Sequence, residues 1–256
     1  MRKFPCCLEG AEVILEIIER KFCSHVPIQP LDKPVTHPTW QSGEVTTTRK
    51  PWIVGVSGAS GSPYAKSVLT ALLDAGETVD LIVSKAARLT LLDETGFTIR
   101  DAHWQADLEK WLERGVSEEQ VAYWQVTDFA AGPSSGSYPA KGMLVIPATS
   151  AACAGIARGL SKDLLQRAAD VNLKEQRPVI IVSRETPLSR SHLVNQLELH
   201  DAGALILPAT PGFYSGAKDL QQLVDFVAGR VLDSIGIPHS LYRRWEGELG
   251  SARKPD

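Results

Sequence analysis

The chain has 256 residues, of which 43% are hydrophobic and 22% are charged, as in an ordinary globular protein. The 27 Lys and Arg residues nearly balance the 30 Asp and Glu residues, and the net charge of −3 argues against a general nucleic-acid binder, which would carry a basic excess. No apolar run approaches the roughly 18 residues of a membrane span, and the amino-terminal residues lack the pattern of a signal peptide, so we expect a cytoplasmic protein without membrane contact.

The first 50 residues differ in composition from the rest of the chain. Apolar residues at mostly helical spacing predict a short amphipathic helix over 8–22, and four prolines predict an extended arm over 25–50. Three cysteines and a histidine in this part could in principle hold zinc, but two of the cysteines are adjacent, which fits ligand spacing poorly and favours reduced thiols. These residues are Cys6, Cys7, Cys23 and His25. We therefore expect an amino-terminal arm over 1–50 and one domain over 51–256.

From residue 52 onward, short apolar segments alternate with helical patterns. Strands are predicted over 53–56, 79–83, 143–146, 179–182 and 204–207. Helices are predicted over 63–75, 86–93, 151–158, 162–174, 190–202 and 218–235, while residues 101–126 show a mixed pattern. This alternation predicts an α/β fold, a flavodoxin- or Rossmann-like parallel sheet with helices on both faces in three layers.

Ligands of an open parallel sheet bind beyond the carboxyl ends of its strands. Here those ends carry hydroxyls, glycines and a charged pair. The segments are 57–61, 84–85, 147–150, 183–187 and 208–214. The loop GVSGASG does not have the dinucleotide spacing, but glycines before a helix let backbone amides approach an anion, and a tight turn without a ligand is the alternative. Such a set suits a phosphorylated ligand.

Several residues keep two interpretations on these grounds alone. Ser84 fits a helix N-cap as well as a ligand contact. Arg184 and Glu185 end the buried segment VIIVS, which favours a functional role because charges there are costly unless paired or used. Lys174 and Arg230 could be solvated charges on helices, whereas the loop that ends at Tyr214 is long enough to present an aromatic side chain to a ligand. His192 indicates packing or capping, and the domain has no metal motif.

Several longer strings resemble one family. They are GVSGASG, SKAARLTLLDET, SSGS, RAADVNLKEQRPVIIVSRETP, HLVNQLELHDAGALILPATPGFY, LVDFVAGRVLDSIGI and RRW, in order from Trp52 to Trp245. This combination resembles the flavin prenyltransferases of the UbiX type. The resemblance implies a homododecameric flavoprotein that transfers a dimethylallyl group from dimethylallyl phosphate to N5 and C6 of reduced FMN without a metal. The prenylated FMN would then serve a UbiD-type decarboxylase.

The resemblance also implies roles for single residues. FMN contacts are expected from Gly58, Ala59, Ser60, Ser84, Thr149, Ser150 and Arg184. The prenyl phosphate would be held by Lys174, Tyr214 and Arg230. Glu185 would support C–O cleavage by acid–base chemistry, Glu94 would assist loss of the C6 proton, and Ser60 would lie near N5, so that Ser60, Glu94, Lys174 and Glu185 form the expected catalytic set. Arg167 would act from outside the site or at an interface, and Trp245 would cap the site.

The sequence departs from the family pattern after Pro147. The family has Cys-Ser-x-x-Thr there, whereas this chain has Ala148-Thr149-Ser150-Ala151-Ala152, so Ser150 or backbone amides must replace the last hydroxyl. Two alternatives remain to be weighed: a carrier that binds FMN without chemistry, and an FMN-dependent decarboxylase of the same superfamily. The complete phosphate-pocket set argues against the carrier. The absence of an Asn-x-x-Met-Trp signature argues against the decarboxylase, since Met occurs only at positions 1 and 143.

Overall fold

The computed structural model describes residues 49–245. The predicted amino-terminal helix, nearly all of the proline-rich arm and the four candidate zinc ligands lie outside the described residues. The strands are β1 (Trp52–Val56), β2 (Val79–Val83), β3 (Val121–Trp124), β4 (Gly142–Ala148), β5 (Val179–Ser183) and β6 (Leu205–Pro208). The helices are α2 (Ser62–Asp74), α3 (Lys85–Thr95), α4 (Trp104–Leu112), α5 (Ser150–Ala157), α6 (Leu164–Lys174), α7 (Arg190–Asp201) and α8 (Leu220–Ser234).

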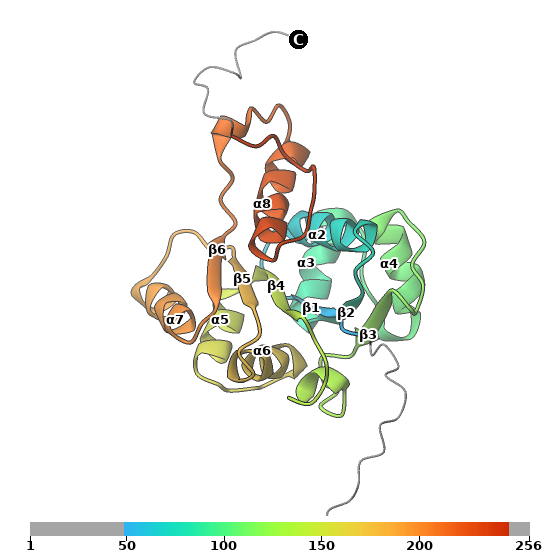
Figure 1. The fold of residues 1–256 in the computed structure, drawn as a ribbon, viewed down its shortest axis with the longest axis vertical. Coiled ribbons are helices and arrows are strands. Elements are labelled where there is room, and N and C mark those ends of the chain that lie inside the picture. The colour runs from blue at the N-terminus through green and yellow to red at the C-terminus, as the bar shows by residue number, and fades with distance from the viewer. Residues whose placement is uncertain (1–48, 246–256) are drawn as a thin grey trace, which may run out of the picture. The chain divides into compact units, whose positions relative to one another are not determined.

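The strands form one parallel six-stranded sheet in the order β3-β2-β1-β4-β5-β6 (Figure 1). This is the strand order of a Rossmann-type doubly wound sheet, and it confirms the predicted fold class. The chain builds outward from β1 to β3 and then returns to place β4 on the other side of β1. The order therefore reverses between β1 and β4, where this class of fold binds its ligands.

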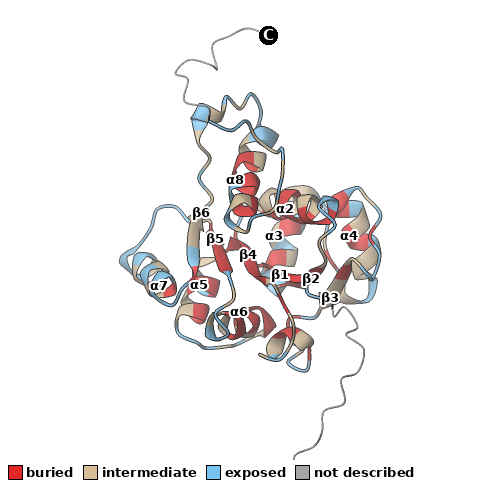
Figure 2. Ribbon diagram, in the orientation of Figure 1, coloured by how far each residue is buried: buried red, intermediate tan, exposed pale blue. Residues whose placement is uncertain are grey.

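Two apolar clusters hold helices against the two faces of the sheet (Figure 2). Side chains from α2, α3, α4 and α8 pack on one face, and side chains from α5, α6 and α7 pack on the other. The central strands β1, β2, β4 and β5 are buried along their whole length, as parallel strands covered on both faces must be. Within residues 49–245, no helix is long and apolar enough to cross a membrane.

The predicted elements agree with the structure to within two residues at each boundary, except over 101–126. That stretch contains helix α4 and edge strand β3, neither of which was predicted. In β3 only Val121 is buried, so the strand lacks the continuous apolar run of its neighbours. Trp104 of α4 stacks on Tyr123 of β3 with ring centroids 5.8 Å apart, and this pairing explains why the aromatic residues here follow no simple period.

Helix α7 begins with a reciprocal cap. The Ser189 hydroxyl accepts a hydrogen bond from the His192 amide at 3.3 Å, and the Ser189 amide donates to His192 Nδ1 at 3.2 Å. Two amide hydrogens that helix geometry leaves without partners are thus satisfied. Of the two roles predicted for His192, packing or capping, the structure shows capping.

Candidate active site

A cavity of about 460 Å³ lies beyond the carboxyl ends of β1, β2 and β4. Its volume falls within the range of small-molecule sites. The lining residues include Gly58, Ser84 and Thr149, three of the residues predicted to contact a flavin, together with Ala152 and Lys162. The structure thus brings residues 57–58, 84–86, 149 and 151–152 around one cavity at the point where the strand order reverses.

Ser57 fastens the two loops on either side of that point. Its buried hydroxyl donates to the Pro147 carbonyl oxygen at 2.7 Å and accepts from the Thr149 amide at 2.8 Å. The Ser57 amide also donates to the Pro147 carbonyl oxygen at 3.2 Å. Sequence analysis assigned Ser57 no role, and no local signal marks it, because its partners lie 90 residues or more along the chain.

Three helices begin at this cavity, each with a side-chain cap. Ser84 accepts from the Ala87 amide at 3.1 Å at the start of α3, and Thr149 accepts from the Ala152 amide at 3.0 Å at the start of α5. Asp163 caps α6 in the same way. The remaining amides of a helix N-terminus and the helix dipole both favour an anion. Ser84 therefore caps α3 as predicted, and it also lines the cavity, so its predicted ligand contact stays a prediction.

Glu94 contacts the loop after β1 from helix α3. Its carboxylate accepts hydrogen bonds from the Gly61 amide at 2.9 Å, the Ser62 amide at 2.8 Å and the Ser62 hydroxyl at 2.6 Å. Burial raises the pKa of Glu94, but hydrogen bonds from Ser60, Ser62 and Gly61 outweigh it and hold the pKa below its ordinary value. Because Gly61 has no side chain, Glu94 supplies the missing cap of α2. The structure thus brings together Ser60 and Glu94, two members of the expected catalytic set. Ala59, which precedes Ser60 in the loop after β1, is buried.

Arg184 and Glu185 follow β5 on the same edge of the sheet. The Ser150 hydroxyl donates to the Glu185 carboxylate, and the Thr186 amide donates to it at 3.2 Å. The hydrogen bond from Ser150 is the main reason why the pKa of Glu185 lies below its ordinary value. Arg184 Nε is buried with no hydrogen-bond partner in the part of the chain that the structure describes. Such a buried donor needs an acceptor, which an anionic ligand can provide.

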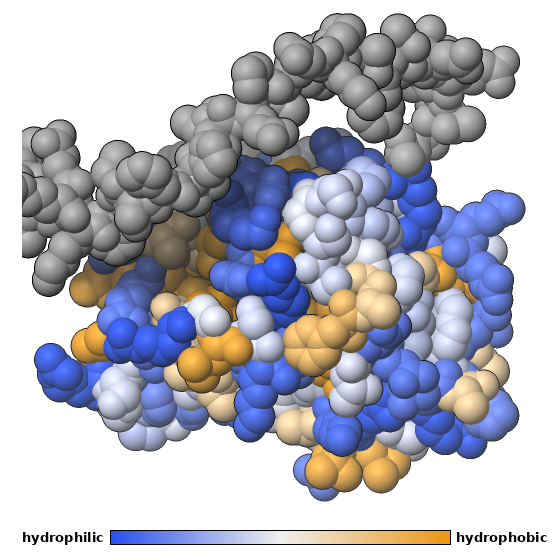
Figure 3. All heavy atoms as spheres, turned by 90° about the horizontal axis from the view of Figure 1, so that it is seen from below, coloured by the Kyte–Doolittle hydropathy of each residue, from blue (hydrophilic) through white to orange (hydrophobic). Residues whose placement is uncertain are grey.

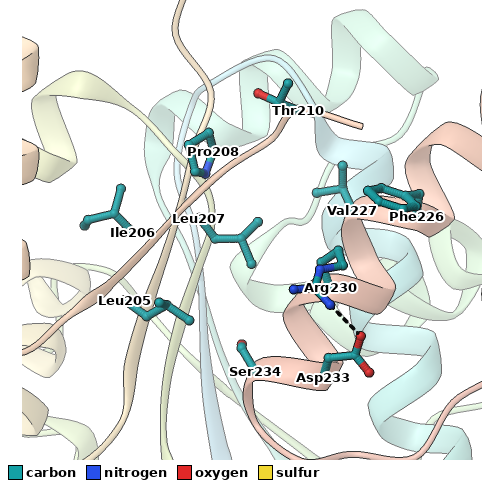
Figure 4. Close-up of a pocket in the computed structure, with 10 residues that line it drawn as sticks. All are labelled: Leu205, Ile206, Leu207, Pro208, Thr210, Phe226, Val227, Arg230, Asp233 and Ser234. Carbon is teal, nitrogen blue, oxygen red and sulfur yellow. Dashed lines mark hydrogen bonds and ion pairs between the residues drawn. The ribbon is translucent and has the colours of Figure 1, made fainter. Parts of the chain in front are cut away.

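A second cavity of about 520 Å³ lies between strand β6 and helix α8 (Figure 4). Arg230 extends from α8 toward β6, and its Nη1 lies 3.1 Å from Asp233 Oδ2. The Tyr214 ring contacts Phe226 and Trp245 edge to face, with ring centroids 5.6 Å and 6.1 Å apart. Trp245, the predicted cap of the site, therefore lies against Tyr214, which is predicted to bind the prenyl phosphate. Tyr214, Arg230 and Trp245 are all at least half exposed.

Lys174 lies in another part of the structure, away from Tyr214 and Arg230. It is the last residue of α6, which starts at the first cavity and extends about 16 Å for its 11 residues. Its ammonium group pairs with Glu175, and α6 covers the opposite face of the sheet from α8 (Figure 1). Within one chain, Lys174 therefore does not meet Tyr214 and Arg230. Arg167 is also held within the chain, by the Ser134 carbonyl oxygen at 3.1 Å and Asp170 at 2.9 Å.

No group of three or more His, Cys, Asp or Glu side chains within residues 49–245 is arranged to hold a metal ion. The donors around the two cavities are hydroxyls, backbone amides, the ammonium groups of Lys85 and Lys162 and the guanidinium group of Arg230, which recognise phosphates and polar ring systems. This part of the structure can therefore bind anions, and it holds two carboxylates with lowered pKa values, those of Glu94 and Glu185.

Comparisons with known proteins place this arrangement in a family. The sequence model of the Flavoprotein family matches residues 41–232. A Streptomyces coelicolor protein named flavin prenyltransferase UbiX is 61% identical over 212 residues, which cover 79% of this chain and 98% of that protein. A Pseudomonas aeruginosa protein of the same name is 38% identical over 194 residues, covering 75% of this chain and 92% of its own length.

Two solved structures are similar over the whole of their own chains or nearly so. The crystal structure of AnUbiX in complex with FMN and dimethylallyl pyrophosphate is 35% identical with a TM-score of 0.69, covering 78% of this chain and 100% of that one. A dodecameric FMN-dependent UbiX-like decarboxylase from Escherichia coli O157:H7 is 36% identical with a TM-score of 0.68, covering 77% of this chain and 100% of that one. The chain therefore belongs to the Flavoprotein family and, within it, to the flavin prenyltransferases of the UbiX type.

Proposed function

We propose that this chain transfers a dimethylallyl group from dimethylallyl phosphate to reduced FMN, forming bonds at N5 and C6. The observation that carries the proposal is the 460 Å³ cavity, whose walls come from the strand-end loops expected to hold FMN. Arg184, which follows β5 at the same edge of the sheet, has a buried Nε without a partner among residues 49–245, and this donor fits an anionic or carbonyl-rich ligand. The flavin supplies the nucleophilic nitrogen and carbon, and the protein supplies binding and proton transfer.

FMN is held by groups that are already in place around the cavity. Ser84 and Thr149 lie at the starts of α3 and α5, and the amides of these helices favour the phosphate. The Gly58–Ser60 loop contributes backbone contacts, and Arg184 contributes its guanidinium. The Ser150 hydroxyl donates to Glu185, so its oxygen remains available to accept a hydrogen bond from the ligand. With Ala152 in place of threonine, the backbone amides of α5 bind the phosphate without the last hydroxyl of the family pattern.

The prenyl donor releases phosphate when its C–O bond breaks. The electrons of that bond leave with the phosphate, so cations and proton donors near the leaving group speed the step. Tyr214 and Arg230 hold this phosphate, which takes the proton that N5 loses, and Glu185, kept ionised by its lowered pKa, accepts that proton from the released phosphate. Closure at C6 uses the prenyl C=C bond: the proton held by Glu185 adds to one of its carbons, the tertiary carbon bonds to C6, and C6 loses its proton. Glu94 accepts that proton with Ser60 beside it, since its lowered pKa keeps it ionised and able to act as a base.

Lys174 reaches the prenyl phosphate from a neighbouring copy of the chain. The sheet separates Lys174 from Arg230 within one chain, so both can hold one phosphate only if two copies pack together. Exposed leucines on α7 and β6, and apolar patches between charged groups on the face seen in Figure 3, offer surfaces for such packing. The E. coli relative is described as dodecameric, and we propose the same homo-oligomer here.

The product would pass to a UbiD-type decarboxylase. A prenylated flavin that stayed bound would block further turnover, so the enzyme must release it to a recipient protein. We place both proteins in the cytoplasm.

Anaerobic incubation with reduced FMN and dimethylallyl phosphate tests the proposal. Mass spectrometry should find a flavin heavier by one C5 prenyl unit, and a parallel reaction with dimethylallyl pyrophosphate decides between the two donors. Glu185→Gln should retain FMN and lose prenyl transfer, whereas Glu119→Gln, at an exposed site away from the cavities, should behave as the parent. Bound but unmodified FMN in every reaction would instead support a carrier, and decarboxylation of an aromatic acid by this chain alone would contradict the proposal.

A further inference from the structure

Asp233 gathers four side chains near the end of helix α8. Its Oδ2 accepts hydrogen bonds from Tyr242 Oη at 2.5 Å and Arg230 Nη1 at 3.1 Å. Its Oδ1 accepts from Arg244 Nη2 at 2.7 Å and lies 3.1 Å from His239 Nε2. The Asp233 side chain is only 17% exposed, so these charge-assisted contacts are partly shielded from water. One carboxylate thus joins α8 to the chain segment that follows it.

Residues 239–245 are bound to α8 through this carboxylate and through an aromatic row. Tyr242 packs on Phe226 with ring centroids 4.9 Å apart, and Phe226 in turn meets Tyr214. Tyr214 meets Trp245 at the end of the segment. The segment therefore runs from the Asp233 carboxylate to the ring of Tyr214, one of the two residues of this chain proposed to hold the prenyl phosphate.

Arg230 has a defined orientation because of the same contacts. Its Nη1 donates to Asp233 and, at 3.4 Å, to Tyr242 Oη. A guanidinium has five N–H donors, so as far as residues 49–245 are concerned its Nε–Nη2 edge is left for a ligand. Two parallel N–H donors on one edge match two oxygens of a phosphate. Arg230 lines the 520 Å³ cavity together with Asp233 and Phe226.

Gly229 provides an independent sign that the segment belongs against α8. A Cβ at this position would lie 2.5 Å from Tyr242 Cδ1 and 2.7 Å from His239 Cε1. A glycine in the middle of a helix is less favourable than an alanine. Here the absence of a side chain at Gly229 lets residues 239–245 approach the backbone of α8.

We propose that Asp233 is a positioning residue for the prenyl phosphate: it orients the Arg230 guanidinium toward the cavity and anchors residues 239–245 so that Trp245 lies against Tyr214. This inference rests on the proposed function. Asp233 does not touch the substrate itself; it acts through Arg230 and the anchored segment.

Two variants test this role by different routes. Asp233→Asn removes the charge that gathers the four side chains. Gly229→Ala leaves every charge in place and favours the helix, but its methyl group displaces Tyr242 and His239. Asp225→Asn is the matched control, because Asp225 lies on the same helix and accepts hydrogen bonds from Ser67 and Gln221 away from the cavity.

Kinetics and limited proteolysis of the full-length protein provide the measurements. Both test variants should raise the KM for dimethylallyl phosphate roughly tenfold or more, the size expected when a charged hydrogen bond is lost. The Kd for FMN should stay within about twofold, and Asp233→Glu should recover part of the loss. Trypsin should cut after Arg243 or Arg244 faster in both variants than in the parent or in Asp225→Asn.

The outcomes separate this inference from the proposed function. A parent protein that binds FMN but makes no prenylated flavin would overturn the proposed function and this role with it. An active Asp233→Asn enzyme with unchanged KM would overturn the positioning role alone. Unchanged KM in Gly229→Ala together with faster trypsin cleavage would show that the anchored segment does not serve the phosphate site.

Discussion

The cap that Glu94 places on helix α2 predicts a stability change that a purely catalytic residue would not produce. Glu94→Gln replaces a carboxylate that accepts hydrogen bonds from two backbone amides and the Ser62 hydroxyl. The glutamine keeps one acceptor oxygen, while its NH₂ group faces a donor. Hydrogen bonds to a charged group contribute about 1.5–3 kcal/mol each, and a negative charge at a helix N-terminus adds about 0.5 kcal/mol. Oε2 accepts two of the three hydrogen bonds, so a glutamine oxygen in its place keeps two neutral bonds of about 1 kcal/mol each, and the low end of these values gives a loss of about 3 kcal/mol.

Urea unfolding of the parent and the variant measures this loss. The free energy of unfolding should fall by about 3 kcal/mol at neutral pH, which leaves a domain of ordinary stability folded. The pKa of Glu94 is lowered in the folded state, so its contribution is full above its ordinary value of 4.5 and is lost as the pH falls through the lowered pKa. Glu113→Gln is the control, since its pair with Lys66 is exposed to solvent and the substitution should leave the free energy of unfolding nearly unchanged. A change of less than about 0.5 kcal/mol in Glu94→Gln would refute the capping role.

Three further outcomes are expected. Asp233→Asn should lower the free energy of unfolding by about 2 kcal/mol at neutral pH, because the contacts of Asp233 lower its pKa from 3.8 to about 2. In acid titrations the stability difference between parent and variant should be full above pH 3.8 and vanish as the pH falls through about 2. A difference that does not change with pH would contradict this cause. Lys162→Gln should weaken FMN binding about fivefold in fluorescence titrations but leave riboflavin binding unchanged, because Lys162 lines the first cavity and only FMN carries a phosphate. Equal losses of affinity for both ligands would count against a phosphate contact by Lys162. The double substitution Leu193→Asp and Leu197→Asp, on the exposed face of α7, should reduce the assembly mass in light scattering, whereas Ser191→Asp should not, and an intact assembly would exclude this face as an interface.

The fold was predictable wherever one physical signal dominated. Buried parallel strands such as β4 and β5 are continuous apolar runs, and helices such as α6 have one apolar face, so their positions follow from the sequence. Edge strand β3 lacks that signal because it is covered less completely, and α4 is hidden by aromatic residues that pack on β3. The alternation of elements also predicted the parallel sheet, since crossover helices must connect parallel strands.

The candidate site was predictable only in part. The strand-end segments 57–61, 84–85 and 147–150 each supply residues that line the first cavity, because parallel strands bring their carboxyl ends to one edge. The partners of Ser57 and of Glu94 could not be read from the sequence, because each contact joins residues more than 30 positions apart. Nor could the separation of Lys174 from Arg230, since the face that a helix covers depends on the path of the chain through three dimensions.

The hydrogen bonds of Ser57, which join the loops after β1 and β4, affect how tightly a flavin can be bound. A loop that must become ordered around a ligand loses conformational entropy, and this loss weakens affinity. Here the loops after β1 and β4 are joined by hydrogen bonds within the protein, through a buried hydroxyl that both donates and accepts. The floor of the cavity is therefore rigid before any flavin arrives, and little of the interaction energy is spent on ordering it. An enzyme that must let go of a modified flavin can then adjust its affinity through side chains at the rim, while the floor keeps its shape through every cycle.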